Sequence, residues 1–376
     1  MRRAFSCLLP VLMASVLLAQ ERSLTVVDLR GTPHERGLTH GKQLREQIGV
    51  MMKAWQRDLE TGLKVDLDTF VTRFLAATKF DEAARQHTPE LLDEIRGIAE
   101  GAGQPYERMF AFQLVDELWA QHKLGVGDKC STIGVDRDGD TPGLVAQNLD
   151  LPQWMNRYPT VLRIHHDGSD LQSLVVTLPG LVGGNGLNNH RVAVGVNTIL
   201  QLRPCPDGLP VAFVVRGILA QRSHADALAF LKRVKHASGQ AYTVGGPDHS
   251  PCFEASAGEV LRWQPEGRDG WTWHTNHPLV NTDWSPSYLA IAKADARPPE
   301  KQMPCSRFEA LDRALPAGKR PTFDDVVAAL RTTGPETPVC NPMTYVCTVM
   351  VLGEKPELHI SPGPPTKVPF QVLRFE

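Results

Sequence analysis

Residues 130–151 read CSTIGVDRDGDTPGLVAQNLDL, two runs of strand-forming residues joined by a loop rich in Asp and Gly. This pattern predicts a β-hairpin. Because side chains alternate along a strand, alternate residues of the second run share one face, which begins with the apolar Leu144 and ends with Asn148 and Asp150. Two polar groups at the end of an apolar face are costly to bury without partners. The hairpin returns both of them toward Cys130, where its first strand starts.

The chain changes character at about residue 127. After a predicted strand at Leu24–Leu29, residues 32–124 show the apolar periodicity of helices. From residue 130 onward, short β-rich runs alternate with turn signals. Helical segments return at residues 209–233, 285–294, 304–315 and 323–331, before the final strands. Strands, then helices, then strands again predict antiparallel sheets covered by helices.

Two of the early helices have clear start signals. The segment Thr32-Pro33-His34-Glu35 is a capping box with proline at the first helical position, so a helix should begin at Pro33. Gly37 and Gly41 then share one face, where another backbone can approach closely. A second helix should start at Thr88-Pro89 and end at Gly101.

The first residues have the features of a secretory signal peptide. The basic start MRR precedes an apolar stretch from Ala4 to Leu18, and Ala19 is a suitable last residue before cleavage. We therefore expect residues 1–19 to be removed and the mature protein to be secreted or periplasmic. No later segment is long and apolar enough to cross a bilayer, so we expect no integral membrane span.

Composition and motif spacing narrow the classes of function. The formal net charge of -2 supplies no basic field for nucleic acid, and seven cysteines in 376 residues are too few for a disulfide scaffold. The pairs His165-His166 and His274/His277 lack a cysteine or carboxylate set at metal-ligand spacing. Gly183–Gly186 lacks the lysine of a phosphate loop. We therefore expect neither a metal nor a cofactor.

Cys130 by itself admits several interpretations. A single cysteine is more often a small buried hydrophobe than a catalyst. It can also be the nucleophile of a papain-like thiol hydrolase, paired with a distant histidine such as His274. In a periplasmic binding protein, Asp150 and Asn276 would contact the ligand, and two parallel-sheet lobes would be expected.

Several motifs occur in an order that is known from one superfamily. They are TPHERGLTHG (residues 32–41), CST (130–132), QNLD (147–150), GLNNHRVAVGVN (186–197) and HTNHP (274–278). Together they resemble the N-terminal-nucleophile hydrolases, in particular the branch of penicillin acyl-coenzyme A acyltransferase, and more distantly the choloylglycine hydrolases. The resemblance spans most of the mature chain.

The resemblance implies a fold and a maturation step. The fold would be α+β, an αββα sandwich of two antiparallel sheets between two helical layers. The chain would be an inactive precursor that cleaves itself between Lys129 and Cys130. Residues 20–129 would become a mainly helical α subunit and residues 130–376 a catalytic β subunit, and the two fragments would stay associated in one domain.

The resemblance also implies roles for individual residues. Cys130 would supply both the thiol nucleophile and, as a new N-terminus, the α-amine that acts as its base. Asp150 would hold that amine, and Asn276 would donate to the oxyanion. Asn197 would act near the oxyanion through its backbone N–H, and Asn148 would orient the site. The substrate would be a small N-acyl amide, such as an N-acyl amino acid, a peptide or a penicillin-like compound.

The chain departs from the family pattern at three places. Lys129 stands where the acyltransferase has glycine, and Gln147 stands where choloylglycine hydrolases have arginine. A serine-arginine pair of the family, just before a late strand, falls at Thr344 and Tyr345. These two positions are expected at the substrate, and Arg216 is the candidate to replace the missing arginine.

Overall fold

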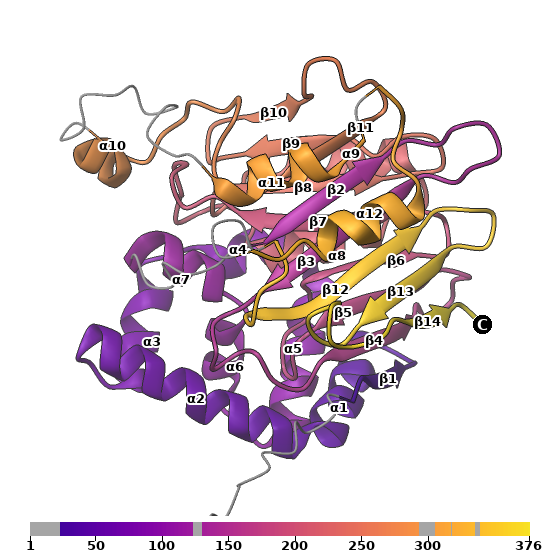
Figure 1. Cartoon of the computed structure of the whole chain (residues 1–376). Helices are drawn as coiled ribbons and strands as arrows, with labels where there is room; N and C mark the ends of the chain where they lie inside the picture. The colour runs from indigo at the N-terminus through magenta and orange to yellow at the C-terminus, as the bar shows by residue number, and fades with distance from the viewer. Residues whose placement is uncertain (1–22, 123–129, 293–304, 317, 335–338) are drawn as a thin grey trace, which may run out of the picture.

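Two β-sheets form the centre of the computed structural model, which describes residues 23–122, 130–292, 305–316, 318–334 and 339–376 (Figure 1). In spatial order, the eight-stranded sheet contains β1 (Thr25–Leu29), β4 (Thr160–His165), β5 (Gln172–Thr177), β6 (Asn185–Asn188), β7 (Ala193–Thr198), β8 (Gln240–Gly245), β9 (Cys252–Ala255) and β10 (Val260–Trp263). The six-stranded sheet contains β11 (Trp271–His274), β2 (Ser131–Val135), β3 (Leu144–Asp150), β12 (Thr344–Val351), β13 (Glu357–Ser361) and β14 (Gln371–Arg374). All paired strands are antiparallel except β1 and β4, which are parallel.

Helices cover both outer faces of this pair of sheets. The helices are α1 (Pro33–Gln43), α2 (Arg45–Leu63), α3 (Leu67–Ala76), α4 (Phe80–His87), α5 (Pro89–Ala102), α6 (Tyr106–Phe112), α7 (Val115–His122), α8 (Val211–Leu219), α9 (His224–Arg233), α10 (Pro286–Ala292), α11 (Ser306–Ala314) and α12 (Phe323–Leu330). Helices α11 and α12 lie on the six-stranded sheet, and α8 and α9 pack against β6, β7 and β8 of the other (Figure 1). The predicted αββα arrangement is confirmed, with one parallel pair at the edge of the eight-stranded sheet.

Polar and very small residues make several close contacts between the two sheets. Gly134 of β2 lies so close to the other sheet that a Cβ there would be 2.3 Å from the Ser250 carbonyl oxygen. Thr132 accepts a hydrogen bond from Asn197 Nδ2 (3.2 Å), and Asn185 Nδ2 donates to Gln147 Oε1 (2.8 Å). The predicted hairpin is β2 and β3, and these contacts between the sheets fix the end of it at which Cys130 lies.

Helices α1 and α5 form the closest helix pair in the N-terminal region. The capping box at Thr32 and Glu35 is present, as predicted. A Cβ at Gly37 would lie 1.9 Å from the Glu94 carbonyl oxygen, and one at Gly41 would lie 2.4 Å from that of Ile98. The predicted close approach of another backbone is therefore confirmed.

The predicted end of α5 at Gly101 is wrong. Gly101 lies inside the helix, where a Cβ would be 2.5 Å from the Leu38 carbonyl oxygen of α1. The helix ends instead at Gly103, which takes the left-handed conformation (φ 66°) that favours glycine. Gly101 serves the contact between helices, and Gly103 serves as the cap.

The N-terminal helices share one hydrophobic core with residues of both sheets. Strand β1 pairs with β4 at the edge of the eight-stranded sheet. The predicted leader at residues 1–19 and Lys129 lie outside the described residues, so the division at residue 129 stays a prediction. No described helix has both the length and the apolar character needed to cross a membrane.

Candidate active site

Cys130 lies buried directly before β2 and lines a cavity. Its thiol is 3.9 Å from the Asp150 carbonyl oxygen at the end of β3. Asp150 lines the same cavity, as the hairpin geometry predicts. Antiparallel pairing places Ser131 opposite Asn148, which brings the end of β3 beside the start of β2.

The cavity is mainly apolar. Its empty volume is about 730 Å³ when the open solvent at its mouth is included. Helix α7, the end of β3, the segment after β5 and helix α8 supply apolar walls that include Trp119, Leu151, Leu178 and Val215. Gln113, Asp116, Thr177, Thr198 and Gln240 are polar lining residues in addition to Cys130 and Asp150. The cavity therefore suits a largely apolar group beside a buried thiol.

Arg307 is the main site residue that sequence reasoning missed. It lies buried in the first turn of α11, and its Nη1 donates to the Cys130 carbonyl oxygen (2.5 Å) and to Ser131 Oγ (3.0 Å). Its Nη2 donates to Asn276 Oδ1 (2.9 Å). One guanidinium thus joins the cysteine to the predicted oxyanion donor. A signal for it is present in the sequence, since Ser306-Arg307 is a serine-arginine pair, but this pair starts a helix, whereas the family pair is expected before a strand.

Asn276 and Asn197 lie close to this arginine but use their side chains differently. Asn276 Nδ2 donates to the Thr198 carbonyl oxygen (3.0 Å) while its Oδ1 accepts from Arg307. Asn197 is fully buried, and its Nδ2 donates both to Thr132 Oγ1 (3.2 Å) and to the Thr275 carbonyl oxygen (3.1 Å). Both N–H groups of the Asn197 amide are therefore engaged, and this side chain fixes the segment that carries Asn276.

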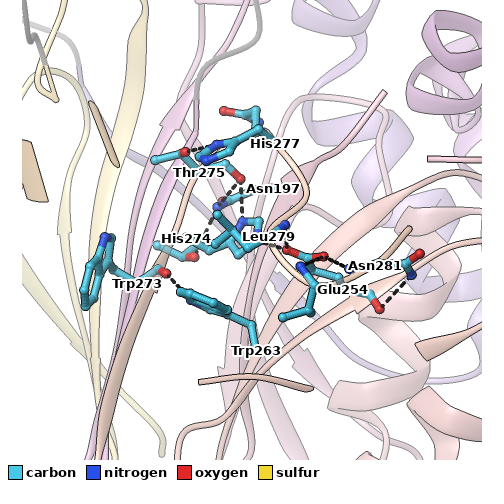
Figure 2. A network of polar contacts seen from close by, with 12 residues as sticks. Asn197, Glu254, Trp263, Trp273, His274, Thr275, His277, Leu279 and Asn281 are labelled. Carbon is cyan, nitrogen blue, oxygen red and sulfur yellow. Dashed lines mark hydrogen bonds and ion pairs between the residues drawn. The ribbon is translucent and has the colours of Figure 1, made fainter. Parts of the chain in front are cut away.

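A buried carboxylate holds the other side of that segment (Figure 2). Glu254 accepts hydrogen bonds from the backbone N–H groups of Leu279 (2.6 Å), Val280 (3.1 Å) and Asn281 (2.7 Å) and is paired with His274 Nε2 (2.7 Å). Burial opposes ionisation of Glu254, but the hydrogen bond and charge of His274 and the backbone donors outweigh it and lower its pKa. Glu254 therefore anchors both ends of residues 274–281.

His274 has both ring nitrogens engaged. Nε2 contacts Glu254, and Nδ1 lies 2.6 Å from the Thr275 carbonyl oxygen, to which Asn197 also donates. The side chain is fully buried. These contacts suit a residue that shapes the Asn276 segment, and they leave neither nitrogen available as the base that a papain-like site would require.

Asn148 and Asp150 lie near one another in β3 but have different surroundings. Asn148 Nδ2 donates to the carbonyl oxygens of Leu330 (2.9 Å) and Val339 (3.0 Å), so its amide holds the end of α12. Asp150 Oδ2 accepts from Asn341 Nδ2 (2.6 Å). Asp150 thus lies at the cavity, whereas Asn148 supports the helical layer behind the sheet.

The three residues expected at the substrate have other partners. Arg216 forms two hydrogen bonds with the Glu94 carboxylate (2.7 and 2.9 Å), and its Nη1 donates to the Val182 carbonyl oxygen (2.9 Å). The Tyr345 hydroxyl donates to backbone carbonyl oxygens, and Thr344 Oγ1 accepts from the Asn341 N–H (3.2 Å). None of the three is among the described residues that line the cavity. The structure gives Arg216 a carboxylate inside the core in place of a substrate.

One group of potential metal ligands lies on the surface of the described chain. Asp28, His165 and Glu376 have ligand atoms within 4.8 Å of one another. Arg163 Nη1 already pairs with Asp28 (3.0 Å) and Glu376 (3.8 Å). A fixed guanidinium at the same carboxylates opposes the binding of a second cation.

One family model matches part of the chain. The family model for acyl-coenzyme A:6-aminopenicillanic acid acyl-transferase matches residues 137–296. This segment begins after Cys130 and contains Asp150, Asn197 and Asn276. The resemblance to the acyltransferase branch is therefore confirmed over these residues.

The individual proteins that resemble this chain have low sequence identity to it. Protein dcd1B of Dictyostelium discoideum is 24% identical over 221 residues, which cover 52% of this chain and 42% of that protein, so the match spans less than half of its length. An ortholog of N-acylethanolamine-hydrolyzing acid amidase from Caenorhabditis elegans is 16% identical, with 66% of this chain and 100% of that chain covered and a TM-score of 0.45. Conjugated bile acid hydrolase from Clostridium perfringens is 11% identical, with coverages of 65% and 92% and a TM-score of 0.39. Penicillin V acylase from Agrobacterium tumefaciens is 14% identical, with coverages of 62% and 82% and a TM-score of 0.35.

Proposed function

We infer that this chain, whose residues 137–296 match the acyltransferase family model, is a self-processing enzyme that cleaves linear amide bonds of N-acyl substrates. The nucleophile is Cys130, freed by cleavage of the Lys129–Cys130 bond, and the acyl group passes to water or to an amine. One observation carries the proposal: Cys130 lines a cavity with Asp150 and is tied through Arg307 to Asn276.

The proposed reaction starts with the amine and thiol of one residue. The Cys130 thiol gives its proton to its own α-amine, whose ordinary pKa of about 8 leaves part of it neutral near physiological pH. The sulfur attacks the substrate carbonyl carbon, and a C–S bond forms as the carbonyl oxygen takes negative charge. We assign to Asp150 the task of holding the α-amine, because it lines the cavity beside Cys130.

The negative oxygen needs donors that are already in place. Asn276 uses one N–H of its amide on the Thr198 carbonyl oxygen, and we assign the other N–H to the oxyanion. Arg307 holds Asn276 Oδ1 and adds positive charge at the same place. Removal of one such donor from a protease lowers kcat by about 10²–10³.

The second half of the reaction restores the enzyme. The tetrahedral intermediate collapses, the C–N bond breaks, and the departing nitrogen takes the proton from the α-ammonium. Water or an acceptor amine then attacks the thioester carbon, and its proton returns to the Cys130 sulfur as the acyl group leaves. The amide substrate and water, or the amide and the acceptor amine, account for all atoms of the products.

We extend the proposal to maturation and location. The Cys130 thiol would attack the Lys129 carbonyl carbon, and the C–N bond between the two residues would break to give a thioester and the free Cys130 amine. Water would then hydrolyse the thioester to release the Lys129 carboxylate and the thiol, and the two fragments would stay together through their common core. The signal-like residues 1–19 support export. The periplasmic binding alternative predicted two parallel-sheet lobes, whereas the structure pairs its strands antiparallel apart from β1 and β4.

Intact-mass analysis of the purified protein tests the proposal. We expect two fragments, the larger starting at Cys130, and a single uncut chain for Cys130→Ala. Cys205→Ala, which removes another buried thiol, is the matched control and should process normally. The processed protein should release amine from N-acyl amides or penicillins in a screen. An uncut wild-type chain that is indistinguishable from Cys130→Ala would sink the proposal.

A further inference from the structure

A chain of hydrogen-bonded polar side chains reaches the cavity through three of its members. We call it the acceptor wall: Asp116 and Glu117 of α7, Thr198 of β7, and Ser238 with Gln240 at the start of β8. Asp116, Thr198 and Gln240 line the cavity that Cys130 lines. The proposed reaction uses none of these side chains.

The side-chain hydrogen-bond donors of the acceptor wall already have acceptors within it. Thr198 Oγ1 donates to Asp116 Oδ1 (2.5 Å), and Ser238 Oγ donates to Glu117 Oε1 (2.8 Å). Gln240 Nε2 donates to Ser238 Oγ (3.1 Å), and the Gln240 side chain also hydrogen-bonds Asp116. Both N–H groups of the glutamine amide and both hydroxyl protons therefore have acceptors.

Acceptors, in contrast, are in excess. Gln240 Oε1, on a residue that lines the cavity, is buried without a hydrogen-bond partner among the described residues. Reversing the Gln240 amide does not help, because it would turn its oxygen toward the Asp116 carboxylate and toward Ser238, whose proton is already used. A buried acceptor without a donor is costly, so this wall favours a group that brings N–H or O–H.

The charged residues that line the cavity also favour a ligand group that donates hydrogen bonds. Its described lining includes two carboxylates, Asp116 and Asp150, and no Lys, Arg or His side chain. Burial raises the pKa of Glu117 to about 7, and the neighbouring charge of Asp116 adds to this effect. Burial raises the pKa of Asp116, and a nearby cation would favour its ionised form. Because Asp150 is assigned to the Cys130 α-amine, Asp116 is the carboxylate that a cation would meet here, whereas an anionic group would be repelled.

We propose that the acceptor wall is a specificity subsite that binds a hydrogen-bond-donating group, best a primary ammonium, carried by an otherwise apolar ligand. Resting on the proposed function, this makes the substrate an N-acyl amide whose apolar part bears such a donor in place of a carboxylate. Thr198 connects the subsite to the reaction, since its hydroxyl contacts Asp116 and its carbonyl oxygen accepts from Asn276.

Binding to an inactive full-length chain tests the subsite without any reaction. Cys130→Ala protein is titrated in a calorimeter with butylamine, hexylamine and octylamine, with the alcohols of the same lengths, and with the matching carboxylates. We expect the best amine to bind at least about tenfold more tightly than its carboxylate, with the alcohol between them. Equal or tighter binding of the carboxylate overturns the proposal.

Two variants on the same background locate the effect. Asp116→Asn should weaken the amine about tenfold and reduce its advantage over the carboxylate, and Gln240→Met should weaken amine and alcohol together. Asp81→Asn, an exposed carboxylate paired with Arg85, is the matched control and should change neither affinity. Unchanged amine affinity in folded Asp116→Asn or Gln240→Met protein contradicts the assignment. Because binding needs neither self-cleavage nor turnover, a failure of the proposed reaction leaves this result interpretable.

Discussion

Two arginines that are buried to the same degree have opposite kinds of partner. Arg216 on α8 is 5% exposed and meets the Glu94 carboxylate through two hydrogen bonds. Arg307 on α11 is 6% exposed, and its described hydrogen bonds reach neutral oxygens of Cys130, Ser131 and Asn276. The charge of Arg216 is compensated inside the core, whereas that of Arg307 lies where the reaction would develop negative charge. Partners, and not burial, distinguish a structural arginine from a candidate functional one.

The largest expected effect is on stability and concerns Arg216. Arg216→Met should remove about 3–5 kcal/mol from the free energy of unfolding, because it leaves a buried carboxylate with too few partners. Arg36 Nη2, 3.5 Å from Glu94, supplies only part of the compensation. Urea denaturation measures the loss, with the exposed Arg222→Met as control. A loss below about 1 kcal/mol is what an ordinary surface ion pair contributes, and it would contradict the structural role given to Arg216.

Arg307 should instead affect the reaction. Arg307→Met is expected to lower kcat/KM by about 10²–10³, because Asn276 loses its fixed partner and the oxyanion loses nearby positive charge. Arg313→Met on the same helix is the control, since Arg313 is exposed and pairs only weakly with Glu309 (3.8 Å). Steady-state kinetics on processed protein check this. Normal kcat/KM combined with a large loss of stability would mean that Arg307, too, is structural.

The sequence predicted the strands and helices around the site better than the partners of its individual side chains. The CST and QNLD runs predicted the hairpin, and the glycines of α1 predicted a close helix contact, because strand alternation and missing side chains act locally. Arg216 and Arg307 could not be told apart in this way. Their partners Glu94 and Asn276 are 122 and 31 residues away in the chain, so only the tertiary fold decides which arginine meets a carboxylate.

The asparagines illustrate the same limit. Asn148, Asn197 and Asn276 all stood in recognisable motifs, yet their amides have different tasks. Asn148 holds backbone carbonyl oxygens at the end of α12, Asn197 holds the Thr275 carbonyl oxygen, and Asn276 meets Arg307. Spacing along the chain placed each residue in or next to a strand but gave no information on the direction of its amide. Glu254 was missed because three of its partners are backbone N–H groups, which leave no mark in the sequence, and the fourth is His274, 20 residues away.

The free energy of unfolding should also depend on pH through His40, which lies near Arg216. His40 Nε2 accepts from the Gly180 N–H (3.0 Å), and burial, with the nearby Arg216, lowers its pKa to about 4 although Glu94 acts against this. Between pH 6.5 and 4 the unfolded chain therefore binds a proton that the folded chain excludes. His40 should contribute a loss of up to about 3 kcal/mol as the pH falls through this window.

Urea denaturation at several pH values checks this. His40→Gln keeps an acceptor for Gly180 but has no titrating ring, so its stability should fall less steeply below pH 6.5 than that of the wild type. The buried His236 also has a pKa lowered to about 4 by burial and contributes to the slope in both proteins. His236→Gln is therefore a useful second variant, whose flattening should add to that of His40→Gln. Parallel curves for wild type and His40→Gln would show that His40 does not make this contribution to the pH dependence of stability.

The smallest effect is expected from Glu254. This residue acts on the site around Arg307 only through residues 274–281, which carry Asn276. In Glu254→Gln an NH₂ group replaces one oxygen that now accepts from donors, so at least one of these hydrogen bonds is lost and residues 274–281 shift. We expect kcat to fall about tenfold with little change in KM, because small displacements of a positioned donor weaken the transition state more than substrate binding. The exposed Glu259→Gln is the control on the same β9–β10 hairpin.

If Glu254 works through Asn276 and Arg307, the double variant with Arg307→Met should lose less kcat than the product of the two single losses. Fully multiplicative losses would show that Glu254 stabilises the fold independently of the site.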